Sequence, residues 1–429
     1  MNLLKISWSN IRFKPMNTLL SIVLLAFGIG IISLMLLLKD QISEKFDRNI
    51  KDIDFVLAAK GSPLQSILAN VYHVDAPTGN IKVSDAKKII RNPMVEMAIP
   101  LAYGDNYEKY RIVGSTSKYP EHYQCTLSEG VMFEKPFEVT VGYTVAKETG
   151  LKLGSTFTSV HGFDNAAEGD LDAHHHDKPY KVVGVFAKSN SAIDNLILTP
   201  VESTWLVHEH GHDDEDHAQD DHAQEDHDHE HVEGESHAGH ALDALDEEPD
   251  REMTAYLIMK RNKGAFGLLS KLTENTTMQL ANVAVENSRL MNNFGLGLST
   301  VTAIAVVITI LSFISIFISL FNSMRERKYE LALMRTMGGT RRTLFTLILQ
   351  EGLLLVVLGF ACGIALSRIG LLILSNTMRD NFHYSLDKLG ITSWEMLLFG
   401  ITLLIGILAS LLPAIRALRI DISKTLSNG

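Results

Sequence analysis

The chain has 429 residues, of which 46% are hydrophobic and 21% are charged. This balance excludes both an ordinary soluble protein and a bare membrane bundle, and it favours a set of membrane spans joined to one or two polar domains. The formal net charge is −11, with much of the acid at residues 208–251, and the two cysteines, Cys125 and Cys362, lie in such different surroundings that they exclude a disulfide framework.

The chain opens on a short basic segment that leads into an uncharged run. Residues 1–15 mix large apolar side chains with three basic ones, which suits either an amphipathic helix on the cytoplasmic face or a plain basic flank. Residues 16–38 carry no charge and, at 1.5 Å per residue, reach about 35 Å, enough to span a membrane. A signal peptide is the alternative. We favour a retained span because the run is longer than a usual signal core and no small-residue cleavage site follows it.

Residues 39–289 mix the patterns of strands and helices. The β-branched run at 180–186 predicts a strand, and residues 84–92 predict a helix capped by its leading serine. Residues 273–289 are polar and are compatible with a helix that continues into the second span. Together these patterns predict an α+β domain.

A histidine-rich insert of low complexity occupies residues 207–250 of this domain and mixes ten histidines with Asp and Glu. Such a composition cannot bury a core, so we expect disorder there. Imidazole suits zinc and other divalent metals, although alternating histidines favour loose capture over one fixed geometry. A solvated acidic linker is the alternative. The candidate metal ligands are His174, His175, His176, His208, His210, His212, His227, His229 and His231.

Three further apolar runs predict spans at residues 296–323, 343–367 and 394–415. Lys and Arg gather before the first span, between the second and third, and after the fourth. The positive-inside rule therefore places both termini in the cytoplasm and residues 39–289 outside. The predicted fold is four transmembrane α-helices in a cytoplasmic membrane, with the α+β extracytoplasmic domain inserted between helices 1 and 2 and the last three helices at 290–429.

The connection at residues 325–342 predicts a short amphipathic helix that ends at two glycines. A helix of this kind between two spans is well suited to enter the groove of a partner protein, and a plain interfacial loop is the alternative. Glu351 follows inside the third span. A carboxylate at membrane depth is a functional candidate, although snorkelling or a structural ion pair near Arg341 and Arg342 would also account for it.

Several motifs carry a family resemblance. They are the opening KISWSNIRFKPMNTLLSIVLLAFGIG, the segment RERKYELALMRTMGGTRR with Glu351 after it, and the ending LLPAIRALRIDISKTL. Together with the order of one span, a large outside domain and three more spans, they resemble the ABC-transporter permeases of the MacB/FtsX-like type. The resemblance covers both ends of the chain and leaves the outside domain weakly matched.

The resemblance implies a permease domain at 290–429, a bacterial cytoplasmic (inner) membrane, and a dimer with a second permease copy or a paralogue. It also implies contact with a separate cytoplasmic ABC ATPase through the helix after span two, a periplasmic adaptor protein, and mechanical transmission within the lipid membrane rather than a wide channel. No nucleic acid partner is expected. The residues that it implies for ATPase coupling are Arg325, Arg327, Glu330, Arg335, Gly338, Gly339 and Arg341.

The printed sequence contains no G-x-x-x-x-G-K-[ST] motif, so we expect ATP to bind to a partner and this chain not to be an enzyme. The leading hypothesis is the permease subunit of an ABC transporter, which couples ATP hydrolysis to substrate export or extraction and is linked to a divalent metal. The runner-up is a metal-sensing membrane regulator that transports nothing. A membrane-bound enzyme is disfavoured because the sequence shows no nucleophile–base motif.

Overall fold

The computed structural model describes residues 7, 9, 15–160, 178–209, 251–262, 264–382 and 390–418. The chain forms two compact units, which we call the sheet domain (Glu44–Leu290) and the helical unit (Met1–Ser43 with Met291–Gly429). The boundary between the units falls inside two long helices, α2 (Pro15–Ile50) and α9 (Val283–Glu326), so each of these helices carries residues of both units.

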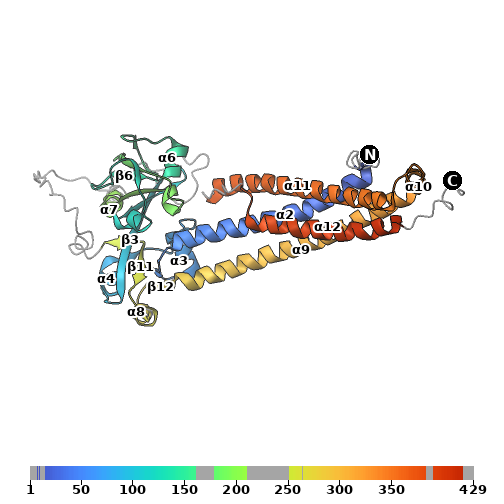
Figure 1. The fold of residues 1–429 in the computed structure, drawn as a ribbon. Helices are drawn as coiled ribbons and strands as arrows, with labels where there is room; N and C mark the ends of the chain where they lie inside the picture. Colours follow the sequence, from blue (N-terminus) through green and yellow to red (C-terminus); the bar gives the residue numbers. More distant parts are fainter. Residues whose placement is uncertain are drawn as a thin grey trace, which may run out of the picture. The chain divides into compact units, whose positions relative to one another are not determined.

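The described part of the chain contains four helices that are long and apolar enough to cross a membrane. They are α2, α9, α11 (Arg341–Phe382) and α12 (Ser393–Leu418), and Figure 1 shows them side by side. The shortest, α12, has 26 residues and extends about 39 Å, more than the roughly 30 Å of a hydrocarbon core. The predicted four-helix membrane region is therefore confirmed.

Close packing holds the helical unit together. An added Cβ at Gly359 of α11 would come within 2.7 Å of Leu25 on α2, so this glycine lets the two helices approach closely. The hydroxyls of Ser21 on α2 and Ser315 on α9 lie 3.1 Å apart and share a hydrogen bond. Because lipid supplies no hydrophobic driving force between helices, such small-residue contacts and hydrogen bonds stabilise the bundle.

The strands of the sheet domain are short and numerous. They are β1 (Phe55–Ala59), β2 (Ile81–Lys82), β3 (Val95–Tyr107), β4 (Tyr110–Ser115), β5 (Leu127–Gly130), β6 (Glu138–Val141), β7 (Thr156–Phe157), β8 (Tyr180–Phe186), β9 (Leu196–Pro200), β10 (Glu252–Met253), β11 (Ala255–Lys260) and β12 (Met278–Asn282). The main sheet has the order β12-β1-β11-β3-β4-β9-β6-β8-β5, with β7 beside β8, and β10 pairs with β2. It is a mixed sheet, because β4–β9 and β6–β8 are parallel while its other pairs are antiparallel.

Short helices cover this sheet, and only some of their starts follow local capping rules. They are α3 (Pro63–Asn70), α4 (Val83–Ile90), α5 (Lys118–His122), α6 (Tyr143–Thr149), α7 (Val201–Glu209) and α8 (Ala265–Thr273), together with the 3₁₀ helix η1 (Ala192–Asn195). Helix α3 is an example, because the Ser62 hydroxyl accepts a hydrogen bond from the N–H of Gln65 and Pro63 occupies the first helical position. The predicted α+β domain is confirmed.

One long strand crosses the middle of the sheet. Strand β3 has 13 residues, pairs with β11 up to Leu101 and continues against β4 from Ala102. It therefore belongs to both halves of the sheet (Figure 1). The sequence reading names no strand here, because Pro100 and Gly104 interrupt a pattern that otherwise suits a strand.

Two local predictions are wrong and one is confirmed. Residues 180–186 form strand β8 as expected. Helix α4 starts one residue earlier than predicted, and its cap residue Lys82 makes no side-chain cap bond, so the serine cap is wrong. Residues 278–282 form the edge strand β12 rather than a helix, because they find a pairing partner in β1. Helix α9 starts only at Val283.

The outer ends of α2 and α9 are fixed within the sheet domain. The side-chain oxygen of Asn49 accepts a hydrogen bond from the N–H of Ala192 at 2.8 Å, and the Tyr123 hydroxyl donates to the Asn49 carbonyl at 2.5 Å. Helix α9 follows β12 directly, and the N–H of Val283 donates to the Asp54 carbonyl at 3.0 Å. Both helices therefore end in hydrogen-bonded contacts with the sheet domain.

Candidate coupling site

A short helix follows α9 after a single non-helical residue. Arg327 has φ −99° and ψ 16°, and α10 (Lys328–Thr336) begins immediately after it. Gly338 has a φ of +96°, and the N–H of Gly339 donates to the Met334 carbonyl at 2.9 Å, which ends the helical turn. The structure thus contains the short helix that the sequence predicts, with both glycines at its end.

One face of α10 is buried against the helical unit. Leu331 and Ala332 are 3% and 0% exposed. Leu331 belongs to an apolar cluster with Leu344, Leu347 and Ile348 of α11. This burial fixes α10 onto the start of α11, so a force on α10 acts on a packed element.

The opposite face of α10 is apolar and exposed. Tyr329, Leu333 and Met337 are 51%, 45% and 74% exposed, and their spacing of four places them on one side of the helix and its C-terminal cap. We call these three residues the apolar stripe. Exposed apolar side chains that are contiguous rather than scattered mark an interaction surface.

The residues that the resemblance implies for coupling are not confined to the side of this stripe, since Arg335 lies about 200° around the helix from Leu333. They lie on α10 or within a few residues of its ends. Arg325, Glu330, Gly338 and Arg341 are exposed, whereas Arg327, Arg335 and Gly339 are partly buried. The sequence reading selected charges and glycines and missed the apolar stripe, although the i, i+4, i+8 spacing was readable in the sequence.

Glu351 is 8% exposed and lies on α11. Its Oε2 is 4.0 Å from Nη1 of Arg327. Arg341 and Arg342, which the sequence reading considered as its neighbours, precede it by nine to ten residues, about 14–15 Å along a helix. The structure therefore places an ion pair at Glu351, but its arginine comes from the bend between α9 and α10.

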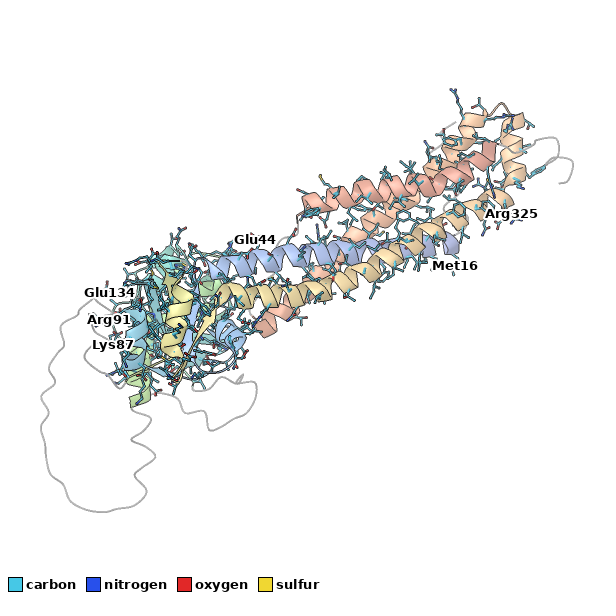
Figure 2. The ribbon with its side chains drawn as sticks, turned by 90° about the horizontal axis from the view of Figure 1, so that it is seen from below. Met16, Glu44, Lys87, Arg91, Glu134 and Arg325 are labelled. Atoms are coloured by element: carbon cyan, nitrogen blue, oxygen red, sulfur yellow. The ribbon has the colours of Figure 1, made fainter. Side chains whose placement is uncertain are left out.

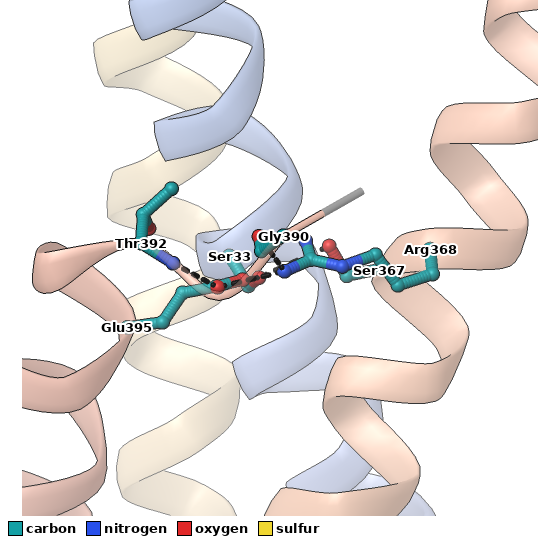
Figure 3. A network of polar contacts seen from close by, with 6 residues as sticks. All are labelled: Ser33, Ser367, Arg368, Gly390, Thr392 and Glu395. Carbon is teal, nitrogen blue, oxygen red and sulfur yellow. Dashed lines mark hydrogen bonds and ion pairs between the residues drawn. The ribbon is translucent and has the colours of Figure 1, made fainter. Parts of the chain in front are cut away.

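A second buried carboxylate joins three helices of the helical unit (Figure 3). Glu395 of α12 is 1% exposed. Its Oε2 accepts hydrogen bonds from Nη2 of Arg368 on α11 at 2.7 Å and from the N–H of Thr392 at 3.0 Å. Its Oε1 accepts from the Ser33 hydroxyl on α2 at 2.6 Å. A buried charge is tolerated when it is paired and hydrogen-bonded in this way.

The sequence reading missed this network, although a local signal was present. The segment Thr392-Ser-Trp-Glu395 has the spacing of a capping box, in which the fourth residue bonds back to the N–H of the first. Arg368 directly follows the predicted span 343–367. Its pairing with Glu395 spans 27 positions, and no local pattern encodes such a contact.

The candidate metal ligands find no support in the structure. His174, His175, His176, His210, His212, His227, His229 and His231 lie outside the described residues, and His208 lies near the end of α7 with an undescribed side chain. Within the described ranges, no group of three or more His, Cys, Asp or Glu side chains could hold a metal ion. The metal link therefore rests on the sequence alone.

A buried histidine in the sheet domain is part of a hydrogen-bond chain. The Tyr103 hydroxyl donates to the Ala69 carbonyl, and its oxygen lies 2.6 Å from Nδ1 of His73. Nε2 of His73 is 2.7 Å from the Tyr119 hydroxyl. A neutral imidazole that donates from Nδ1 and accepts at Nε2 satisfies every group. Burial, with a smaller effect from the Arg111 guanidinium, lowers the pKa of His73 from 6.5 to about 3.

This lowered pKa predicts acid sensitivity of the sheet domain. Below about pH 6.5, His73 is protonated in the unfolded chain and stays neutral in the folded protein. The free energy of unfolding is therefore at its full value above pH 6.5 and declines by about 1.4 kcal/mol per pH unit as the pH falls toward 3. Burial also lowers the pKa of His122, which acts in the same direction. Denaturant unfolding of the full-length protein should therefore show a steeper loss between pH 7 and pH 5 for the wild type than for His73→Asn. Equal losses would contradict the assignment.

Two family models match the chain, one in its N-terminal part and one in its C-terminal part. Residues 18–225 match the MacB-like periplasmic core domain, and residues 302–422 match the FtsX-like permease C-terminal family. The chain is also 22% identical, over 446 residues, to the pyoverdine export ATP-binding/permease protein PvdT of Pseudomonas putida. That alignment covers 99% of this chain and 58% of the relative, so the chain spans less than two thirds of the length of PvdT.

Two solved structures are distantly similar to the chain. The periplasmic region of MacB from Actinobacillus actinomycetemcomitans is 12% identical with a TM-score of 0.32, over 57% of this chain and 96% of that one. The extracellular domain of the noncanonic ABC-type transporter YknZ from Gram-positive bacteria is 12% identical with a TM-score of 0.29, over 53% of this chain and 99% of that one.

Proposed function

The chain belongs to the MacB/FtsX-type permeases of ABC transporters, and on this premise we propose that it transmits force from a cytoplasmic ABC ATPase to its periplasmic domain to drive export. The ATPase docks on α10. Its nucleotide-driven movement displaces α10, and the membrane helices carry the displacement to the sheet domain. The transported substrate is handled on the periplasmic side rather than in a wide channel.

The apolar stripe of α10 is the observation that carries this proposal. Tyr329, Leu333 and Met337 together expose apolar surface, and the charged residues around them supply the polar rim that is common at protein interfaces. A tyrosine beside two flexible apolar side chains is a favourable anchor for a groove on a partner. The buried opposite face gives the docked helix a rigid backing.

The two helices that enter the sheet domain supply the route for the force. Helices α2 and α9 are each continuous through residues of both units. Asn49 bonds to Ala192 at the end of α2, and Val283 bonds to Asp54 at the start of α9. A displacement along α9 therefore reaches strand β12 directly, and one along α2 reaches the sheet domain through the hydrogen-bonded end of the helix.

Several partners complete the proposal. The positive-inside rule places both termini and α10 in the cytoplasm, where the ATPase lies. A second permease, either a copy or a paralogue, forms the other half of a dimer, and a periplasmic adaptor engages the sheet domain. The relative PvdT is described as an ATP-binding/permease protein for pyoverdine export, which supports export as the direction. ATP itself binds to the ATPase.

Co-purification tests the proposal. Full-length chain extracted from its native membrane in mild detergent should carry an ABC ATPase, and the ATP hydrolysis rate of the complex should differ from that of the ATPase alone. A preparation in which the chain comes alone under several detergents and after mild cross-linking would contradict the proposed function.

A further inference from the structure

Arg327 is the residue at which α9 turns into α10. It has non-helical dihedral angles, yet its N–H donates to the Ser323 carbonyl at 3.1 Å and its carbonyl accepts from the N–H of Leu331 at 3.0 Å. Hydrogen bonds from the last turn of α9 and the first turn of α10 thus meet at one residue. Figure 2 marks this end of α9 at Arg325, two residues before the bend.

The side chain of Arg327 lies between two carboxylates. Its Nε is 3.0 Å from Oε2 of Glu330 on α10, and its Nη1 is 4.0 Å from Oε2 of Glu351 on α11. The Glu330 side chain is 59% exposed and the Glu351 side chain only 10%. Exposed ion pairs contribute little, whereas a carboxylate withdrawn from water depends on its partner. Glu351 is therefore the carboxylate whose interaction with Arg327 carries weight.

A small cleft surrounds this contact. Arg327 and Glu351 line it together with Ser323, Leu331 and Leu347. Glu330 is not part of its lining, so the cleft lies on the side of the guanidinium that faces Glu351.

We propose that Arg327 is a positioning residue that ties α10 to α11 through Glu351, so that a displaced α10 moves α11 instead of bending at the α9–α10 junction. The inference rests on the proposed function, because it assigns a role to this contact when the ATPase acts on α10. Loss of the tie leaves α10 able to bind the ATPase and unable to pass its movement on.

Hydrogen exchange in the purified permease without any ATPase tests the tie itself. Glu351→Gln should speed exchange of the α10 amides at least about tenfold, because a largely buried ion pair that holds the helix is lost. Glu330→Gln, which removes the exposed partner of the same arginine, should change it less than about twofold. Glu351→Asp, which keeps the charge, should restore part of the protection.

A double variant guards against misfolding. Arg327→Gln with Glu351→Gln removes both charges, and unchanged protection of the sheet-domain amides shows that the protein is folded. Fast α10 exchange in this variant supports the tie. Wild-type exchange of α10 in both Glu351→Gln and the double variant would overturn it.

A second experiment uses the complex of the permease with the ABC ATPase. The Glu351→Gln permease should bind the ATPase within about threefold of wild type, because its apolar stripe is intact. A non-hydrolysable ATP analogue should change exchange along α11 in the wild-type complex and leave it unchanged in the variant. An equal response in both overturns the proposed tie and leaves docking in place. If the wild-type permease binds no ATPase, the proposed function fails. The hydrogen-exchange experiment on the permease alone still decides whether Arg327 ties α10 to α11 through Glu351.

Discussion

The permease with Leu333→Asp is expected to reach the membrane and to lose its ATPase. Leu333 is 45% exposed and lies at the centre of the apolar stripe, so the substitution leaves the buried face of α10 untouched. A carboxylate placed in an apolar docking groove would be buried without a partner, which costs several kcal/mol. Binding should therefore weaken at least about a hundredfold, measured by titrating purified ATPase onto the immobilised permease.

A matched control separates charge from position. Lys328→Asp places a carboxylate, in exchange for an ammonium group, at another exposed position of the same helix, about 140° around the axis from Leu333. This variant should keep its affinity within about threefold. If Leu333→Asp binds as tightly as wild type, the apolar stripe is not the docking surface. If both variants fail alike, the general charge of α10 matters rather than the stripe.

The second large effect is expected at Glu395. Glu395→Ala leaves the guanidinium of Arg368, whose side chain is 15% exposed, without its carboxylate. Breaking a buried ion pair from one side destabilises a protein by about 3–5 kcal/mol. The substitution also removes one of the two acceptors near the Ser33 hydroxyl, the other being the Ser367 hydroxyl. Chemical denaturation of the purified protein in mild detergent, followed through its helical circular dichroism, should show this loss.

Two further variants establish the cause. Arg368→Met combined with Glu395→Leu removes both charges and should recover most of the stability, because two apolar side chains carry no desolvation cost. Glu44→Ala removes an exposed ion pair with Arg48 and should cost less than about 1 kcal/mol. A Glu395→Ala protein as stable as wild type would show that the network does not hold the three helices together.

Some features of the helical unit are predictable from local sequence patterns, and others are not. Uncharged runs predict the four helices because lipid leaves the backbone no other hydrogen-bonding solution. The end of α10 at Gly338 is predictable because a positive φ favours glycine. The partner of Glu351 was not predictable, because the bend at Arg327 that brings the two residues together depends on tertiary packing.

The sheet domain shows the same division. Strand β8 was readable because its β-branched residues occur in an unbroken run. Residues 278–282 looked compatible with a helix and form β12 because β1 offers them an edge, a case of tertiary context overriding a weak local preference. The apolar stripe was missed for another reason. Apolar residues line both faces of α10, and sequence alone does not say which face the bundle covers.

The most direct test of the account is cross-linking from α10 itself. A photoreactive amino acid at position 333, on the exposed stripe, is compared in native membranes with the same amino acid at position 331, where Leu331 is 3% exposed. The account predicts a nucleotide-binding ATPase as the main product from position 333 and no such product from position 331. Products from position 333 that contain only lipid or other permease chains would contradict it.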